Sequence, residues 1–270
     1  MKLFIITKQT IICLTICLFA AVLAGVISLG AVAQTTQTAA ETREIPIYCV
    51  DTQEKKVALS FDAAWGNEQT EQLLNILDKY NVKTTFFLVG EWVDKYPDSV
   101  KEIAKRGHDV ENHSNTHAYM TQLSESDMDT EINECNKKIQ DLTGNCPTLF
   151  RAPYGDYNNP VVKAVKENDM YCIQWDVDSL DWKDPSPQQI VKNITDKIEC
   201  GSIILMHNGA TNTPEALPIV IESIQAEGYE IVPISEIIPQ GDYTTDANGM
   251  MHITTKEESE SKAKTETTSE

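Results

Sequence analysis

The stretch Val57-Ala-Leu-Ser-Phe-Asp62 is a short apolar run that ends in an acid, and a helical pattern follows it over residues 68–80. In that second segment the apolar residues recur at helical spacing, as Leu73, Leu74, Ile76 and Leu77. A buried strand followed directly by an amphipathic helix is the repeating unit of α/β folds. The stretch therefore predicts an α/β fold with Asp62 at the carboxyl end of a strand.

The same alternation of strand and helix continues through the rest of residues 45–238. Further strand-like segments lie at 84–89, 109–112, 148–150, 171–177, 202–206 and 230–232. Helical patterns lie between them at 99–106, 124–143, 160–167, 187–199 and 214–227. Ser124 is suited to begin the long helix and Gly144 to end it. Seven strand–helix alternations predict a parallel sheet or barrel, in which functional side chains gather at the carboxyl ends of the strands.

The charge balance argues against one class of partner. The chain has 22 Lys and Arg against 41 Asp and Glu, a net charge of −19. Proteins that bind nucleic acid gain most of their affinity by neutralising phosphates with basic side chains. The composition therefore predicts no nucleic-acid partner and favours a neutral or locally cationic substrate.

The N-terminal segment predicts export. After Lys2 and Lys8 no charged residue occurs until Glu41, and the apolar run from Ile11 to about Ala33 is long enough to span a bilayer. Its small residues before Gln34 also match a cleavage site. Residues 1–33 are thus expected to be a signal peptide or an N-terminal membrane anchor. Either one places the remaining chain outside the cytoplasm, membrane-anchored or secreted.

The other boundaries follow from composition. Residues 34–44, rich in Thr, Gln and Ala, are expected to be a linker, and residues 239–270 a disordered polar tail. Five cysteines lie outside the apolar run, so at least one is free or pairs between chains. Cys135 with Cys146, or Cys172 with Cys200, are candidates for pairing, and the sequence does not fix the connectivity.

The segment His113-Ser-Asn-Thr-His117 has the spacing of a metal-ligand pair, because four residues bring two imidazoles onto one side of a helical turn. The other interpretation is a pair of hydrogen-bonded histidines at a helix start. Zinc and similar divalent ions need a third ligand and an open water position. The histidine pair therefore needs a partner elsewhere in the chain.

Further chemistry-bearing residues follow strand-like segments. Asp62 is suited to be a general base, a metal ligand or a helix N-cap. Arg151 is suited to hold a carboxylate in place, near a backbone N–H that could meet an oxyanion, or to form a surface salt bridge. The pair Asp181-Trp182 fits a turn with a partly buried tryptophan, and His207 fits a histidine at a strand end.

In this order, the segments resemble those of the polysaccharide deacetylases, the NodB-homology group that forms carbohydrate esterase family 4, over about residues 50–238. The five matching motifs are Ser60-Phe-Asp62, His113-Ser-Asn-Thr-His117, Arg151-Ala-Pro-Tyr154, Asp178-Ser-Leu-Asp-Trp182 and Leu205-Met-His207. The resemblance implies a distorted (β/α)7 barrel. It also implies a hydrolase of linear amides that removes N-acetyl groups from amino sugars of a cell-wall polysaccharide, either peptidoglycan or a chitin-like polymer.

The resemblance implies a role for each motif residue. Asp62 would be the base that takes a proton from the attacking water, Arg151 would orient Asp62, and His113 and His117 would hold a divalent metal (zinc, cobalt or manganese). The backbone N–H of Tyr154 would help to bind the oxyanion. His207 would protonate the leaving amine, with Asp181 fixing its charge state. Trp182 and Leu205 would line the slot for the acetyl methyl group.

One position departs from the family pattern. The first motif normally has two consecutive acids, the second of which is a metal ligand, and this chain has Asp62-Ala63. Losing a ligand should weaken metal binding considerably, since changes around the ligands alone typically cost about 10–100-fold. The run Ser-Phe-Asp-Ala-Ala-Trp-Gly is similar to a variant in the sporulation-associated branch of the family.

Two alternatives to the deacetylase remain. The first is a carbohydrate-binding pseudoenzyme that has lost tight metal binding through Ala63. The second is a glycosidase that uses Asp62 with Asp178 or Asp181, which leaves the histidine pair without a role.

Overall fold

The structure is a computed structural model that describes residues 42–239 and 241–254. The predicted signal peptide or anchor, and most of the predicted linker, lie outside the described residues. Within the described ranges no helix is both long enough and apolar enough to cross a membrane.

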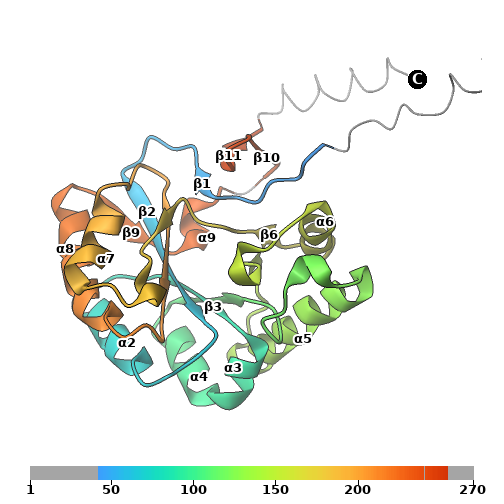
Figure 1. Cartoon of the computed structure of the whole chain (residues 1–270), viewed down its shortest axis with the longest axis horizontal. Helices are drawn as coiled ribbons and strands as arrows, with labels where there is room; N and C mark the ends of the chain where they lie inside the picture. The colour runs from blue at the N-terminus through green and yellow to red at the C-terminus, as the bar shows by residue number, and fades with distance from the viewer. Residues whose placement is uncertain (1–41, 240, 255–270) are drawn as a thin grey trace, which may run out of the picture. The chain divides into compact units, whose positions relative to one another are not determined.

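The main sheet carries the site, and its paired strands run parallel (Figure 1). In the described part of the chain it has eight strands, with β6-β5-β4-β3-β2-β8-β7 in order and β9 beside the start of β2. The strands are β2 (Lys56–Ala63), β3 (Thr85–Leu88), β4 (Asp109–Asn112), β5 (Leu149–Phe150), β6 (Tyr171–Cys172), β7 (Val177–Asp178), β8 (Ile203–His207) and β9 (Glu230–Val232). This curled sheet confirms the α/β class and the distorted barrel.

Helices surround the sheet (Figure 1). They are α2 (Thr70–Lys79), α3 (Gly90–Lys95), α4 (Pro97–Lys105), α5 (Glu125–Thr143), α6 (Asn159–Glu167), α7 (Pro187–Thr195), α8 (Thr213–Ala226) and α9 (Ile234–Ile237). Three short 3-10 turns are η1 (Met120–Gln122), η2 (Pro153–Gly155) and η3 (Asp181–Lys183). The predicted ends of α5 are confirmed, because the Ser124 side chain accepts a hydrogen bond from the N–H of Asp127 and Gly144 ends the helix in the left-handed conformation.

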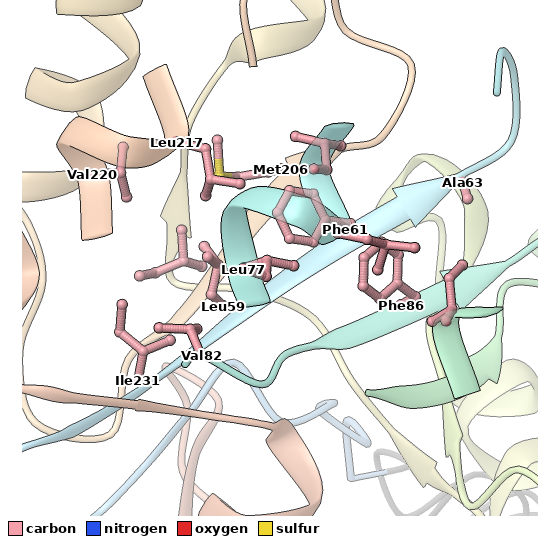
Figure 2. Close-up of a cluster of buried hydrophobic side chains, with 14 of the residues drawn as sticks. Leu59, Phe61, Ala63, Leu77, Val82, Phe86, Met206, Leu217, Val220 and Ile231 are labelled. Atoms are coloured by element: carbon pink, nitrogen blue, oxygen red, sulfur yellow. The ribbon is translucent and has the colours of Figure 1, made fainter. Parts of the chain in front are cut away.

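Strand β2 separates the apolar core from the polar site. Leu59, Phe61 and Ala63 belong to the largest buried apolar cluster, where the Phe61 ring stacks on Phe86 with centroids 5.0 Å apart (Figure 2). Successive side chains of a strand point to opposite faces. Ser60 and Asp62 therefore point to the other face, which places Asp62 at the carboxyl end of β2 on the polar side of the sheet.

The predicted strand at 171–177 is wrong as a single element. It forms two short strands at opposite ends of the sheet, with β6 beside β5 and β7 beside β8. The N-terminal segment connects the β6 side to β8, because Ile47 pairs with Ile173 and Cys49 pairs with Ser202. The two ends of the sheet are thus connected by residues 47–49, which are far from them in the sequence. The sequence around residues 171–177 therefore does not show that the segment forms two strands.

A second, three-stranded sheet corrects the prediction for the C-terminal tail. It has the order β1-β11-β10, formed by β1 (Cys49–Val50), β10 (Tyr243–Thr245) and β11 (Met250–Ile253). A disordered tail from residue 239 is therefore wrong for residues 241–254, because their backbone pairs with β1 and Met251 is buried with Ile47 and Val50. Residues 255–270 lie outside the described residues.

Two smaller predictions are also tested by the structure. The last residues of the predicted linker contact the domain, since the N–H of Glu44 donates to Asn159 and Arg43 donates to Tyr157. The five cysteines at 49, 135, 146, 172 and 200 are free thiols, so neither candidate pair forms a disulfide.

Candidate active site

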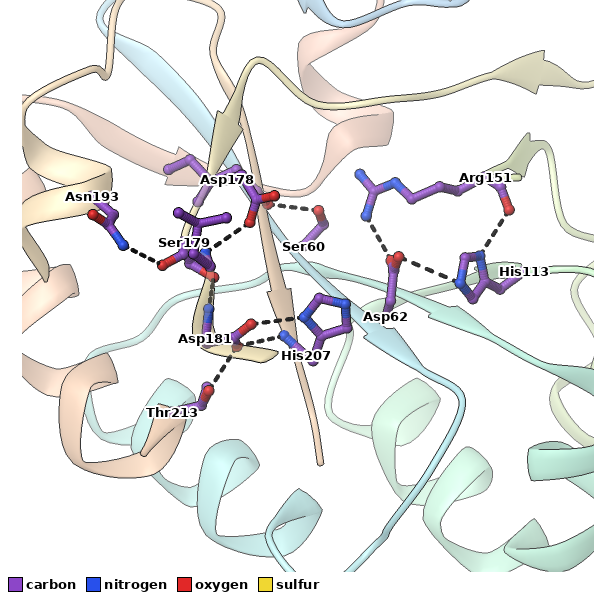
Figure 3. Close-up of polar contacts among 12 residues, drawn as sticks. Ser60, Asp62, His113, Arg151, Asp178, Ser179, Asp181, Asn193, His207 and Thr213 are labelled. Atoms are coloured by element: carbon purple, nitrogen blue, oxygen red, sulfur yellow. Dashed lines mark hydrogen bonds and ion pairs between the residues drawn. The ribbon is translucent and has the colours of Figure 1, made fainter. Parts of the chain in front are cut away.

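The centre of the site is a buried ion pair between Asp62 and Arg151. Arg151 follows β5 and is fully buried, with its guanidinium 4.1 Å from the centroid of the Phe87 ring. Its Nη1 donates to Asp62 Oδ1 at 2.7 Å (Figure 3). Burial opposes the charged form of Asp62, but the charge of Arg151, with contributions from His113 and His207, outweighs it and lowers the pKa of Asp62. Asp62 is therefore a carboxylate with one oxygen, Oδ2, left for other partners.

His113 places a ring nitrogen against that second oxygen. Its Nδ1 lies 2.8 Å from the carbonyl oxygen of Arg151, which can only accept, so Nδ1 carries the proton. Burial lowers the pKa of His113, so the ring is neutral and Nε2 presents a lone pair. This Nε2 lies 3.4 Å from Asp62 Oδ2. Two acceptors that face each other repel unless a proton or a cation lies between them, so this is a position suited to a cation.

His117 lies beside His113, as its spacing predicts, but the two residues are not on a helical turn. The two ring centroids are 5.1 Å apart. Residues 113–117 form a loop after β4 rather than a helical turn, with Ser114 and His117 in the left-handed region at φ of 66° and 60°. Burial, with a contribution from His113, lowers the pKa of His117 to about 4. Both imidazoles are thus neutral near pH 7, which is the form that binds metal ions.

Glu131 on α5 holds this loop in its strained conformation. Its Oε2 accepts hydrogen bonds from the backbone N–H groups of Asn115 and Thr116, both at 2.8 Å. Its Oε1 accepts from the Thr116 hydroxyl, also at 2.8 Å. The loop between the two histidines therefore depends on a carboxylate that the sequence analysis did not single out.

Replacing Glu131 by Ala is expected to lower the free energy of unfolding by about 1–3 kcal/mol, because the loop loses three hydrogen bonds to a charged acceptor. The imidazole NMR signals of His113 and His117 should shift in the same variant. Urea denaturation measures the first effect. Glu134→Ala is the matched control, since Glu134 is an exposed residue of the same helix. Equal unfolding curves and unchanged histidine signals in the two variants would show that Glu131 does not hold the loop.

The possible ligand atoms around His113 and His117 are of the kinds that bind divalent cations, but they are few. His113 and His117 supply neutral nitrogens and Asp62 supplies one oxygen, whereas Ala63 contributes only a buried methyl group to the apolar cluster. Among the residues that the structure describes, no three His, Cys, Asp or Glu side chains are grouped as metal ligands. These side chains therefore match a site that binds a divalent cation weakly.

His207 and Asp181 form a second buried pair at the end of β8. His207 Nδ1 lies 2.7 Å from Asp181 Oδ1, and Asp181 Oδ2 accepts from the N–H of His207 at 2.8 Å and from the Thr213 hydroxyl at 2.7 Å. Burial opposes protonation of His207, but the hydrogen bond and charge of Asp181 outweigh it and raise its pKa. The protonated form of His207 is thus favoured. Figure 3 shows His207 and His113 on either side of Asp62.

The remaining predicted residues lie around these two pairs. The Tyr154 ring lies 4.5 Å from the His117 ring between centroids, and its backbone takes φ of 60° within η2. Trp182 directly follows Asp181 in η3 and is exposed. Leu205 pairs in register with Ser60, as His207 does with Asp62, so Leu205 lies on the sheet face that carries the site. All nine predicted residues thus lie at the carboxyl ends of the strands or in the loops that follow.

Trp65 is a neighbour of the site that lies outside the five sequence motifs. It lies in the loop after β2, and its ring centroid is 5.1 Å from that of His207. Its position three residues after Asp62, just beyond the end of β2, is the sequence feature that could have placed it at the site.

Comparison with known proteins identifies the family. The profile of the family described as polysaccharide deacetylase matches residues 50–173. A peptidoglycan-N-acetylglucosamine deacetylase of Bacillus cereus is 31% identical over 194 residues, which cover 70% of this chain and 91% of that protein. The Bacillus subtilis protein YlxY, described as uncharacterized, is 35% identical over 72% of this chain, and the matched part is only 61% of YlxY.

One solved structure with the same fold is described as a pseudoenzyme and not as an active deacetylase. The CE4 family pseudoenzyme of Bacillus anthracis is 36% identical, with a TM-score of 0.69, over 71% of this chain and 68% of that one. A mutant of it, 38% identical to this chain, is described as having restored enzymatic activity. With the matched profile, the Bacillus cereus relative covered over most of its length, and the shared barrel, this chain belongs to the polysaccharide deacetylases of carbohydrate esterase family 4.

Proposed function

We propose that this domain hydrolyses N-acetyl groups on the amino sugars of a cell-wall polysaccharide, either peptidoglycan or a chitin-like polymer. The supporting observation is that Asp62 and His207 are register partners on adjacent strands, and that their surroundings lower the pKa of Asp62 and raise that of His207. A carboxylate base and an imidazolium acid at one site are what amide hydrolysis requires, because water must lose a proton and the amine must gain one.

Each residue has a step in this proposal. Asp62, held by Arg151, accepts a proton from the water that attacks the acetamide carbonyl. The backbone N–H of Tyr154 donates to the oxyanion that forms. His207, held by Asp181, gives its proton to the nitrogen as the C–N bond breaks, so the products are acetate and a free amine. Trp182 and Leu205 line the slot for the acetyl methyl group.

His113 and His117 would hold the divalent cation, either zinc, cobalt or manganese. Such an ion polarises the carbonyl oxygen and lowers the pKa of water. Because catalytic zinc sites usually have three protein ligands, a site with two imidazoles should bind weakly when the nearest carboxylate, Asp62, is paired with Arg151 and serves as the base. The activity should therefore depend on added metal.

The location proposed is outside the cytoplasm. It is supported by the apolar segment of residues 1–33, which would anchor the chain in a membrane or direct its secretion, and by the peptidoglycan substrate named for the Bacillus cereus relative. The partner is thus a polysaccharide of the wall and not nucleic acid, consistent with the net charge of −19.

Acetate release tests the proposal. The substrates are N-acetylglucosamine oligomers and peptidoglycan, each with added zinc, cobalt or manganese. Wild type is compared with a variant in which both Asp62 and His207 are changed to Ala and whose fold is checked by circular dichroism. Release from wild type that does not exceed the double variant with any of the metals means that the chain is not a deacetylase.

A carbohydrate-binding pseudoenzyme is the second candidate. Ala63 favours it, because this buried methyl group supplies no ligand, and the solved Bacillus anthracis relative is described as a pseudoenzyme. Metal content separates the two candidates. A protein that holds no metal under saturating zinc, yet binds oligosaccharides, fits the second.

Replacing Ala63 by Asp restores the second acid of the family's first motif and is expected to raise the affinity for zinc by at least about 10–100-fold, because the new carboxylate at the last residue of β2 turns from the apolar face to the cation as a third ligand. Without zinc the variant should be less stable than wild type, since the new carboxylate replaces a methyl group among Phe61 and Leu88. Calorimetric zinc titration and thermal unfolding measure the two effects. Ala63→Asn is the uncharged control, and equal zinc affinity of the two variants would mean that position 63 cannot reach the metal.

A further inference from the structure

The exposed aromatic side chains of the described residues all lie around the candidate site. Four are exposed: Trp65 (44%), Tyr119 (48%), Tyr154 (58%) and Trp182 (51%). We call these four residues the aromatic rim. They come from four different segments of the chain, so their gathering at one place is a property of the fold and not of a local sequence run.

The aromatic rim has two sides. Trp65 lies against His207, and Trp182 follows Asp181, which defines the acid side. Tyr154 lies against His117, and Tyr119 stacks on Tyr154 with centroids 4.2 Å apart and planes at 13°, which defines the histidine side. Asp62 lies between His207 and His113 in Figure 3. The exposed rings thus lie on both sides of the reacting centre.

On the acid side, Trp65 packs closely against Gly209. A Cβ atom on Gly209 would lie 2.5 Å from the carbonyl oxygen of Trp65 and 2.7 Å from its Nε1, so only glycine leaves room for the indole. The neighbouring carbonyl of Gly66 accepts a hydrogen bond from Trp92 Nε1 at 2.6 Å. The indole therefore packs against a backbone position that only glycine can occupy, although Trp65 is 44% exposed.

On the histidine side, a carboxylate ties the two tyrosine-bearing segments together. Asp156, two residues after Tyr154, accepts from the N–H of Thr121 at 2.9 Å and from its hydroxyl. Thr121 is two residues after Tyr119. The stacked pair is thus preformed, and a ligand that binds it needs to order little of the protein.

A sugar ring is the ligand that matches these surfaces. The C–H face of a pyranose is apolar and packs on a flat aromatic ring, while its hydroxyl groups stay in contact with water. A net charge of −19 disfavours anionic ligands and leaves neutral glycans unaffected. Rings on both sides of the centre match sugars on both sides of the one that reacts.

We propose that Trp65 and Tyr119 bind the sugars that flank the reacting residue, Trp65 on the acid side and Tyr119, stacked on Tyr154, on the histidine side. The preferred substrate is then an internal residue of a neutral N-acetylated glycan of at least three sugars. This inference rests on the proposed function for the identity of the central sugar, and it adds the two flanking subsites.

Binding of N-acetylglucosamine oligomers of one to five sugars to the full-length chain tests this inference. Calorimetry without added metal measures affinity independently of turnover. In wild type the affinity should rise with length up to at least three sugars. Trp65→Ala and Tyr119→Ala should each lower the affinity for the longer oligomers by about 3- to 10-fold and leave that for the single sugar unchanged. Trp65→Phe and Tyr119→Phe should retain most of the wild-type affinity.

Ile219→Ala is the control, since Ile219 is an exposed apolar residue on α8, outside the aromatic rim. The inference fails if the wild-type affinity does not depend on length, or if the two Ala variants keep the wild-type length dependence. Its failure is separable from failure of the proposed reaction. Length-dependent binding through these rings without acetate release contradicts only the reaction, whereas acetate release with unchanged binding in the Ala variants contradicts only the flanking subsites.

Discussion

Replacing Asp62 by Asn is expected to lower the free energy of unfolding by about 3–5 kcal/mol at neutral pH, because it leaves the Arg151 guanidinium buried without an anionic partner. Arg151 is fully buried and Asp62 is only 4% exposed, so water cannot replace the lost partner. Urea denaturation measures the effect. The double variant Asp62→Asn/Arg151→Met is expected to recover part of the stability, because it removes both charges.

The pH dependence of this loss follows from the direction of the Asp62 pKa. The pKa is lowered in the folded protein, so the carboxylate stabilises the fold above the unfolded pKa of about 3.9, and this contribution is lost as the pH falls through the folded value. The difference between wild type and Asp62→Asn should be constant above about pH 4 and shrink in more acid solution. A difference that stays the same there would assign the loss to packing and not to charge.

The positions of two candidate catalytic residues could be predicted from the sequence. Asp62 is the penultimate residue of β2 and His207 is the last residue of β8, and the apolar runs before them mark both strands. Since parallel neighbours bring their carboxyl ends to one edge, the two residues were expected at one site. The structure makes them register partners. The apolar runs do not predict the order of the strands in the sheet.

The parts that were wrong depend on contacts between distant segments. Strand β11 pairs with β1, which lies about 200 residues earlier in the chain. The polar composition of residues 241–254 therefore predicted disorder, although these residues form an ordered sheet with β1. Non-glycine residues rarely take a positive φ, and nothing local in the sequence marks Ser114 and His117 as doing so. Their loop is held by Glu131 from another element. A spacing of four residues therefore predicted the proximity of His113 and His117 but not the helical turn.

Replacing Asp181 by Asn is expected to lower the pKa of His207 below that of a free histidine, because the largest contributions that raise it are removed and burial then outweighs the charges of Asp62 and Asp178. In wild type the pKa is raised, so the protonated ring stabilises the fold fully below about pH 6.5 and loses this contribution as the pH rises through the folded value. The variant should lose the general acid at neutral pH. Acetate release at pH 7 should then fall by about 10²–10⁴-fold.

The pH profile of acetate release distinguishes loss of the acid from loss of the fold. In Asp181→Asn the alkaline limb should move to lower pH, and NMR titration of the His207 ring should show the same shift even if turnover is absent. Thr213→Val is the matched control, since it removes one hydrogen bond to Asp181 Oδ2 but leaves the carboxylate and its charge, so it should not lower the pKa of His207. If the His207 titration does not move in Asp181→Asn, the imidazolium is held by some other group, and Asp181 only orients the ring through Oδ1 and the backbone N–H through Oδ2.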